Sequence, residues 1–183
     1  TIKVGFDPRV RHSSRDSNPT FLQNLDINPN TQRIYVIDRV SNNTVSVINE
    51  KTNNVTHIKV GFFPLHIAIN SRTNLVYIPD FGGVSVIDDN IVGYSFQNAT
   101  NTIMVNQGIP SAIAVNPNTN KIYMSYFGSN TVAIIDGDTK NVTQVRVGSD
   151  TFAIAVNPNT NKVYIPNMGS NTVSVIDGNS NNV

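Results

Sequence analysis

The 183-residue chain contains no cysteine and few charged residues, and these absences exclude several kinds of site. Without cysteine it forms neither a disulfide nor a thiolate metal site. Charged residues make up 14% of the chain and the net charge is +1, so we expect no nucleic acid and no anionic lipid as a partner. No apolar run approaches the length of a membrane span, about 18 residues or more, and no segment has helical periodicity over a useful length.

A stretch of about 25 residues recurs four times along the chain. Its clearest copy is residues 153–177, AIAVNPNTNKVYIPNMGSNTVSVID, and more varied copies occupy residues 112–136, 66–88 and 24–49. The tyrosines that align between copies are 42, 46 and 41 residues apart; they are Tyr35, Tyr77, Tyr123 and Tyr164. A period of roughly 40–45 residues is typical of β-propeller blades and related arrays.

Each copy is predicted to form four short strands. In the last copy the first three are residues 154–156, 162–166 and 172–177, separated by Asn-Pro-Asn-Thr and Gly-Ser-Asn turns. The fourth strand is clearest at residues 55–60 and 142–147, each followed by glycine. We therefore predict a single all-β domain, a β-propeller of four-stranded antiparallel blades. The blades are expected at about 21–61, 62–108, 109–148 and 149–183, the last completed by residues 1–5.

The two ends of the chain suggest how the array closes. The last copy stops where its fourth strand would begin, and residues 1–5, TIKVG, resemble a fourth strand without a blade. We expect this N-terminal strand to complete the last blade and close a four-bladed ring, which would remove an exposed edge. The alternative is that the four blades are part of a larger ring.

Two insertions interrupt the repeat, at residues 8–20 and 89–101. Insertions on one face of a repeat protein often form its binding face, although a tolerated surface loop is equally consistent. The loops between second and third strands should share a face with insertion 8–20. Aromatic residues, methionine and arginine together favour an interface, unless they pack over the channel mouth. The candidates are Arg9, Arg11, His12, Arg15, Arg39, Phe62, Phe63, Phe81, Tyr126, Phe127 and Met168.

The first strand of each blade should line the central channel, where crowding favours small residues. Alanine occupies these positions in later copies, whereas earlier copies place Asn24, Asp26 and His66 there. We favour a hydrogen-bonded polar plug over a small-ligand or enzymatic site. One histidine and one aspartate are too few ligands to predict a metal. No serine–histidine–aspartate spacing or carboxylate pair predicts catalytic residues, and we expect no cofactor.

Four Asn-x-Ser/Thr triplets fall in predicted turns and are candidate N-glycosylation sites: Asn42, Asn54, Asn98 and Asn141. An Asn- and Thr-rich chain also produces such triplets by chance.

The repeats resemble the YVTN-type β-propeller family of surface-layer or YncE-like proteins. The resemblance rests on Asn-Pro-Asn-Thr at 28–31, 116–119 and 157–160, on the tyrosine-containing second strands, and on SNTVSVID at 170–177. It covers residues 24–183 and 1–5, although the naming tetrapeptide is imperfect, for example Tyr-Val-Ile-Asp at 35–38. The resemblance implies a non-enzymatic, extracytoplasmic binding or surface protein and carries no catalytic residues.

Together these observations predict an extracellular or cell-surface propeller that presents a loop face to a protein or glycan. Two alternatives stay open. One is a small-ligand, metal or enzymatic site at the channel. The other is a structural element of a cell envelope, for which homo-oligomerisation would be expected.

Overall fold

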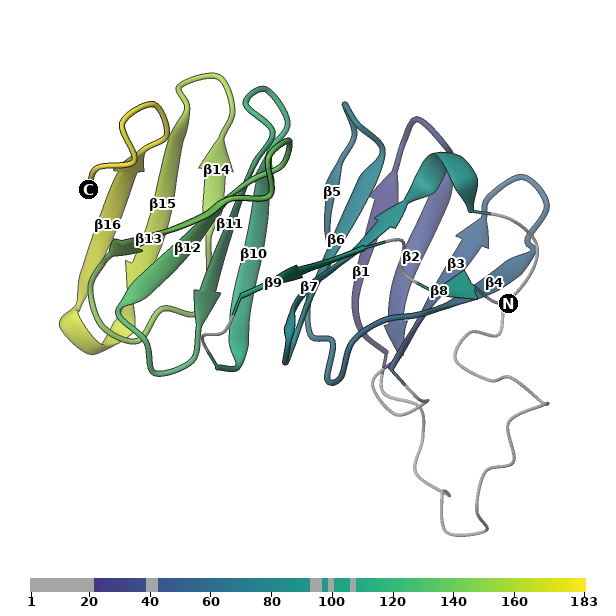
Figure 1. Cartoon of the computed structure of the whole chain (residues 1–183), viewed down its shortest axis with the longest axis horizontal. Helices are drawn as coiled ribbons and strands as arrows, with labels where there is room; N and C mark the ends of the chain where they lie inside the picture. Colours follow the sequence, from purple (N-terminus) through teal and green to yellow (C-terminus); the bar gives the residue numbers. More distant parts are fainter. Residues whose placement is uncertain (1–21, 39–42, 93–96, 99–100, 106–107) are drawn as a thin grey trace, which may run out of the picture.

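A computed structural model describes residues 22–38, 43–92, 97–98, 101–105 and 108–183. These residues form four β-sheets that stand side by side in chain order, from β1–β4 at one end to β14–β16 at the other (Figure 1). The prediction of an all-β protein built from antiparallel blades is confirmed. Residues 1–5, insertion 8–20, Arg39 and Asn42 lie outside the described residues.

Blades 1 and 2 each contain four antiparallel strands, and blade 1 has a further strand at its outer edge. In blade 1 the order is β1 (Leu22–Asn28), β2 (Arg33–Asp38), β3 (Thr44–Asn49), β4 (Val55–Lys59) and β8 (Gln97–Asn98). In blade 2 it is β5 (Ala68–Asn70), β6 (Leu75–Asp80), β7 (Gly83–Asp88) and β9 (Asn101–Met104).

Blade 3 has four strands and blade 4 has three among the described residues. In blade 3 the order is β10 (Pro110–Asn116), β11 (Lys121–Tyr126), β12 (Thr131–Asp136) and β13 (Val142–Arg146). In blade 4 it is β14 (Ala155–Asn157), β15 (Lys162–Asn167) and β16 (Thr172–Asp177). The two short 3₁₀ helices are η1 (Asp89–Ile91) and η2 (Met168–Ser170). Neither has the length or apolar character to cross a membrane, and no other helix is described.

Side-chain amides shape the turns between first and second strands. The Asn116 Oδ1 accepts the backbone N–H of Asn118 at 3.0 Å, and the Asn157 Oδ1 accepts those of Asn159 and Thr160. Each turn ends on a residue in the left-handed region, which asparagine tolerates. These residues are Gln32, Asn74, Asn120 and Asn161, with φ between 52° and 56°. The repeated Asn-x-x-Thr-Asn pattern is therefore a local turn signal.

The core is divided among three seams between consecutive blades. Each seam packs one face of a blade, bearing its tyrosine and two β-branched residues of the third strand, against an aliphatic face of the next blade. Between blades 3 and 4, for example, Tyr123, Val132 and Ile134 pack with Val163 and Ile165. Burial in these seams raises the pKa of Tyr77 and of Tyr123 to about 12.

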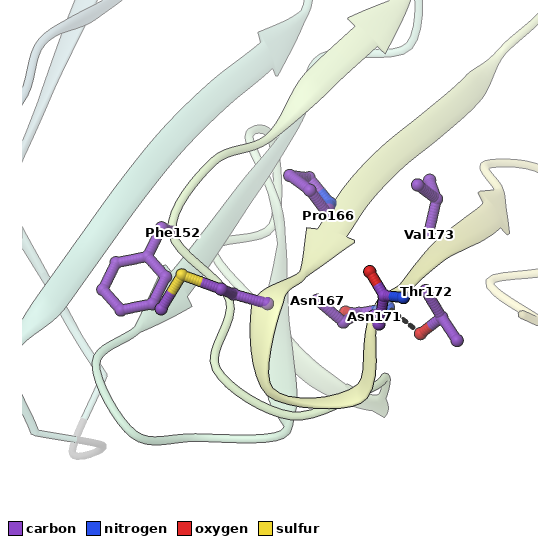
Figure 2. A pocket seen from close by; sticks show the side chains of 7 residues that line it. Phe152, Pro166, Asn167, Asn171, Thr172 and Val173 are labelled. Atoms are coloured by element: carbon purple, nitrogen blue, oxygen red, sulfur yellow. Dashed lines mark hydrogen bonds between the residues drawn. The ribbon is translucent and has the colours of Figure 1, made fainter.

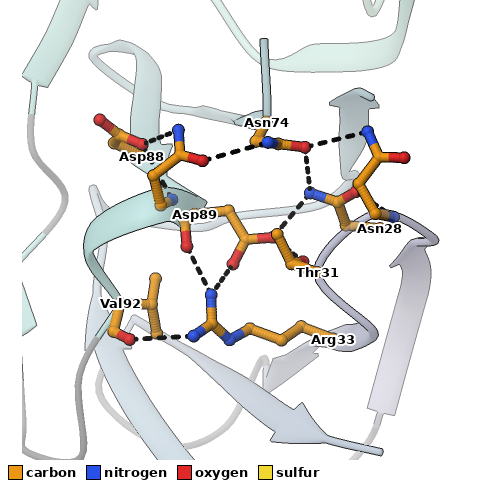
Figure 3. A network of polar contacts seen from close by, with 9 residues as sticks. Asn28, Thr31, Arg33, Asn74, Asp88, Asp89 and Val92 are labelled. Carbon is orange, nitrogen blue, oxygen red and sulfur yellow. Dashed lines mark hydrogen bonds and ion pairs between the residues drawn. The ribbon is translucent and has the colours of Figure 1, made fainter. Parts of the chain in front are cut away.

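The insertion after β7 strengthens the seam between blades 1 and 2. Helix η1 follows β7 directly, and β8 pairs in parallel with β4 of blade 1. The Arg33 guanidinium donates to the Asp89 carboxylate at 2.6 Å and to the Val92 carbonyl at 3.1 Å (Figure 3). Asn28 Nδ2 also donates to this buried carboxylate, at 2.6 Å. The described part of the insertion therefore joins blade 2 to blade 1.

The described blades form an open arc. The innermost strands contact one another in the order β1, β5, β10 and β14, and no comparable contact joins β14 back to β1 among the described strands. Blades 1 and 4 lie at opposite ends of the molecule (Figure 1). The closed four-bladed ring is thus not seen, because the faces of the first and last blades do not meet in the described part of the chain.

Candidate functional site

The loops between second and third strands meet the loops that enter each blade. Phe81 N–H donates to the Phe62 carbonyl at 2.8 Å, and Phe127 N–H donates to the Ile109 carbonyl at 2.9 Å. In blade 4, Met168 N–H donates to the Asp150 carbonyl at 3.0 Å. These three bonds bring the two sets of loops together at one end of the blades.

Four phenylalanines on these loops form two exposed pairs. Phe62 and Phe81 pack edge to face with ring centroids 6.2 Å apart, and Phe127 and Phe152 do so at 5.4 Å. All four side chains remain substantially exposed, and Met168 is more exposed than any of them. We call this set of residues the aromatic loop face: Phe62, Phe81, Phe127, Phe152 and Met168.

Three residues of this region differ from expectation or were missed. Tyr126 is not on the aromatic loop face, because its ring is buried in the seam between blades 2 and 3, where it points to the aliphatic side of its strand. Phe63 is half-buried, and its N–H donates to Asn43 Oδ1 at 3.1 Å. Phe152 was missed; it lies four residues after Gly148, whereas Phe62 directly follows Gly61.

The other interaction candidates cannot be placed on this face. Those outside the described residues are Arg9, Arg11, His12, Arg15 and Arg39. Of the candidate glycosylation sites, Asn54 and Asn141 are exposed at turns, which fits a modifiable position. Asn98 lies in β8, and Asn42 is outside the described part of the chain.

The polar residues of the innermost strands form hydrogen bonds to the next blade. Asn24 Oδ1 accepts the Ile67 N–H at 3.2 Å. Burial raises the pKa of Asp26, while hydrogen bonds from the backbone of Ile27 and Ile69 act in the opposite direction. Burial lowers the pKa of His66, and a hydrogen bond with the Ser111 backbone opposes that effect.

Asn24, Asp26 and His66 thus each form a hydrogen bond with the backbone of the next blade. Within the described residues, no group of three or more histidine, aspartate or glutamate side chains is placed to hold a metal ion.

No family model and no curated protein sequence matches the chain. Solved structures do match it. Hydrazine synthase from Kuenenia stuttgartiensis aligns with a TM-score of 0.75 and 19% identity, over 94% of this chain and 51% of that one. A nidogen/laminin complex aligns with a TM-score of 0.68 and 10% identity, over 87% and 62%. An auxiliary nutrient binding protein from Bacteroides thetaiotaomicron gives 0.65 and 13%, over 87% and 39%.

These similarities, together with the four sheets, define the fold as a β-propeller. Identities this low show the fold alone. The chain spans less than two thirds of each of these matched chains.

Proposed function

We propose that this propeller is a non-enzymatic binding module of YVTN type, acting outside the cytoplasm or at the cell surface, which binds a protein or glycan through its aromatic loop face. The observation that carries the proposal is that two phenylalanine pairs, Phe62–Phe81 and Phe127–Phe152, are exposed on adjoining loops. Large aromatic side chains and methionine gathered at a surface are typical of interface centres rather than of inert surface.

The rigidity of the loops supports this role. Backbone hydrogen bonds tie each aromatic loop to the loop beside it, so the rings are held in place before a partner arrives. Preorganised side chains lose less conformational entropy on binding. The fold itself does not choose the function, since the similar structures include a protein named as a synthase and another named as a nutrient binding protein.

The test compares two double variants, Phe62→Ser/Phe81→Ser and Phe127→Ser/Phe152→Ser, with Val142→Ser as control. Val142 is an exposed apolar residue on β13, outside the aromatic loop face. A glycan microarray and a cell-envelope protein fraction from the source organism serve as the two probes. Each variant is first checked for unchanged circular dichroism and thermal unfolding.

We expect at least one probe to bind the wild-type protein, and at least one double variant to lose about tenfold or more of that binding, since interface aromatics commonly contribute more than 1 kcal/mol each. The Val142→Ser control should bind as the wild type does. Binding that survives in both double variants, or no binding to either probe, would contradict the proposal.

A further inference from the structure

Blades 1 and 3 carry an asparagine at the same place in the turn between their third and fourth strands. The turn of blade 1 closes with a hydrogen bond from the Asn49 N–H to the Asn54 carbonyl, at 3.0 Å. The turn of blade 3 closes with the corresponding bond from the Asp136 N–H to the Asn141 carbonyl, at 2.9 Å. Both asparagines are followed by valine and threonine. Two of the four Asn-x-Thr triplets are therefore structurally equivalent.

Other side chains form the hydrogen bonds that shape these two turns. In blade 1, Asn49 Oδ1 accepts the backbone N–H of Thr52 at 3.1 Å, and Thr52 Oγ1 accepts that of Asn54 at 3.3 Å. Asp136 and Thr139 form the corresponding bonds in blade 3. The asparagine that begins each triplet therefore contributes its backbone to the turn, and the turn is built without its side chain.

The side-chain amides of Asn54 and Asn141 have no structural role among the described residues. No described residue forms a hydrogen bond with either amide, and both side chains are exposed. Asparagines elsewhere in the repeat do have such a role, since the Nδ2 atoms of Asn28, Asn70 and Asn116 donate across the seams between blades. A group attached to Asn54 or Asn141 would therefore break none of the hydrogen bonds that the described residues form.

The turn of blade 1 projects into solvent even though blade 2 packs against the same blade. All of residues 50–54 are exposed. The residue before each triplet, Asn53 or Lys140, has left-handed backbone with φ of 58° or 64°, which makes the tight bend that leads into the fourth strand. A bulky group at this position would extend away from the blade rather than toward its neighbour.

Both turns lie at the end of the blades opposite to the aromatic loop face. They follow β3 and β12, whose first residues adjoin the loops at the aromatic end (Figure 1). Phe152 of the aromatic loop face lies beside the loop between β15 and β16 at that end (Figure 2). Strands of six residues, about 20 Å long, separate the two ends. A group on Asn54 or Asn141 would leave the aromatic loop face accessible.

We propose that Asn54 and Asn141 are N-glycosylated, an inference that rests on the proposed location of the protein outside the cytoplasm. The co-reactant is a lipid-linked oligosaccharide phosphate. The asparagine Nδ2 forms a bond to the anomeric carbon of the first sugar and loses one proton, while the bond from that carbon to the phosphate oxygen breaks and the lipid phosphate leaves. The threonine two residues later completes the acceptor triplet, which is read at surface turns.

The experiment is peptide mapping by mass spectrometry of the untagged protein, purified from each cell fraction of the source organism and from its medium. The peptides that contain Asn54 and Asn141 should carry an added mass and release sugar oxonium ions on fragmentation, and the modified form should be the major one. Asn118 is the internal control. It is an exposed turn asparagine without a serine or threonine two residues later, and it should be unmodified.

Variants expressed in the source organism separate the acceptor from the rest of the triplet. Asn54→Gln and Asn141→Gln should each remove one added mass, and the double variant should remove both. Thr143→Ala should abolish the modification of Asn141, whereas the matched control Thr143→Ser should retain it. Each substituted side chain is exposed, so these variants should keep the wild-type circular dichroism.

Several results would overturn the inference. Protein recovered outside the cytoplasm with unmodified Asn54 and Asn141 would refute the glycosylation and leave the proposed location intact. Unmodified protein found in the cytoplasmic fraction alone would refute both. Modification at one asparagine alone would contradict the equivalence of the two turns. A sugar mass that persists in the double glutamine variant would assign the glycan to another residue.

Discussion

Blades 3 and 4 have nearly the same sequence but bury different residues. Over the first strand and the following turn, residues 112–120 and 153–161 are identical, AIAVNPNTN in both. Yet Val132 is fully buried and its equivalent Val173 is mostly exposed. The aligned amides differ in the same way, since Asn116 is buried and Asn157 is exposed. Burial in this array is therefore a property of the neighbouring blade rather than of the repeat.

The largest difference in the free energy of unfolding is expected between Arg33→Ala and Lys162→Ala. These substitutions change equivalent positions, one between blades 1 and 2 and the other at an exposed residue of blade 4. Loss of Arg33 leaves the Asp89 carboxylate buried without its cation, and should lower the free energy of unfolding by about 3 kcal/mol or more. Lys162→Ala should cost less than about 0.5 kcal/mol. Urea unfolding of dilute protein measures both. Equal losses would show that the Arg33 network does not hold blades 1 and 2 together.

A smaller difference is expected between Val132→Ala and Val173→Ala. Val132 is packed between blades 3 and 4, so its truncation removes buried apolar surface and leaves a cavity, at a cost of about 2 kcal/mol. In dilute protein Val173→Ala should change the free energy of unfolding by less than about 0.5 kcal/mol. Comparable urea midpoints for the two variants would mean that Val173 is packed as tightly as Val132 in the single chain.

The pair Asn116→Ala and Asn157→Ala isolates one inter-blade hydrogen bond. Both substitutions remove the side-chain bonds that shape the turn, but only Asn116 also donates to Asn161 in the next blade. Asn116→Ala should therefore cost about 1 kcal/mol more than Asn157→Ala, the usual net contribution of a hydrogen bond. Thermal unfolding of both variants measures this difference. An equal cost would show that the hydrogen bond between Asn116 and Asn161 does not stabilise the protein.

The smallest effect concerns pH at His66. Burial lowers the pKa of His66 from its ordinary 6.5, so the unfolded chain binds protons more readily. The free energy of unfolding should then fall as the pH decreases through 6.5, by less than about 1 kcal/mol because solvent screens this half-buried group. His66→Gln should flatten the profile between pH 7.5 and 5. An unchanged slope would assign the pH dependence to another group.

Much of the fold could be predicted because its signals are local. The positions of Tyr35, Tyr77, Tyr123 and Tyr164 gave the blade period, and the predicted second and third strands agree with β15 and β16 to within a residue. Alternation along a strand and asparagine-rich turns depend on backbone geometry within a few residues. These local features do not depend on which segment packs beside the blade.

The candidate site was less predictable because it depends on contacts between distant segments. Tyr126 is aligned with Asp38, Asp80 and Asn167, yet sequence alone placed it on the loop face rather than in the seam. Phe152 completes a pair with Phe127 from 25 residues further along the chain. Neither outcome follows from strand periodicity, which gives the side of a sheet but not what covers it.

The sequence by itself determined the all-β architecture, the four blades and their turns, since each repeat contains the complete pattern for its own strands. Only the tertiary structure decided that the insertion after β7 joins blade 1, that the phenylalanines pair, and that Val132 is buried whereas Val173 is exposed. The physical reason is that hydrogen bonding within a blade is local, whereas burial of its two faces requires neighbours that the repeat does not itself specify.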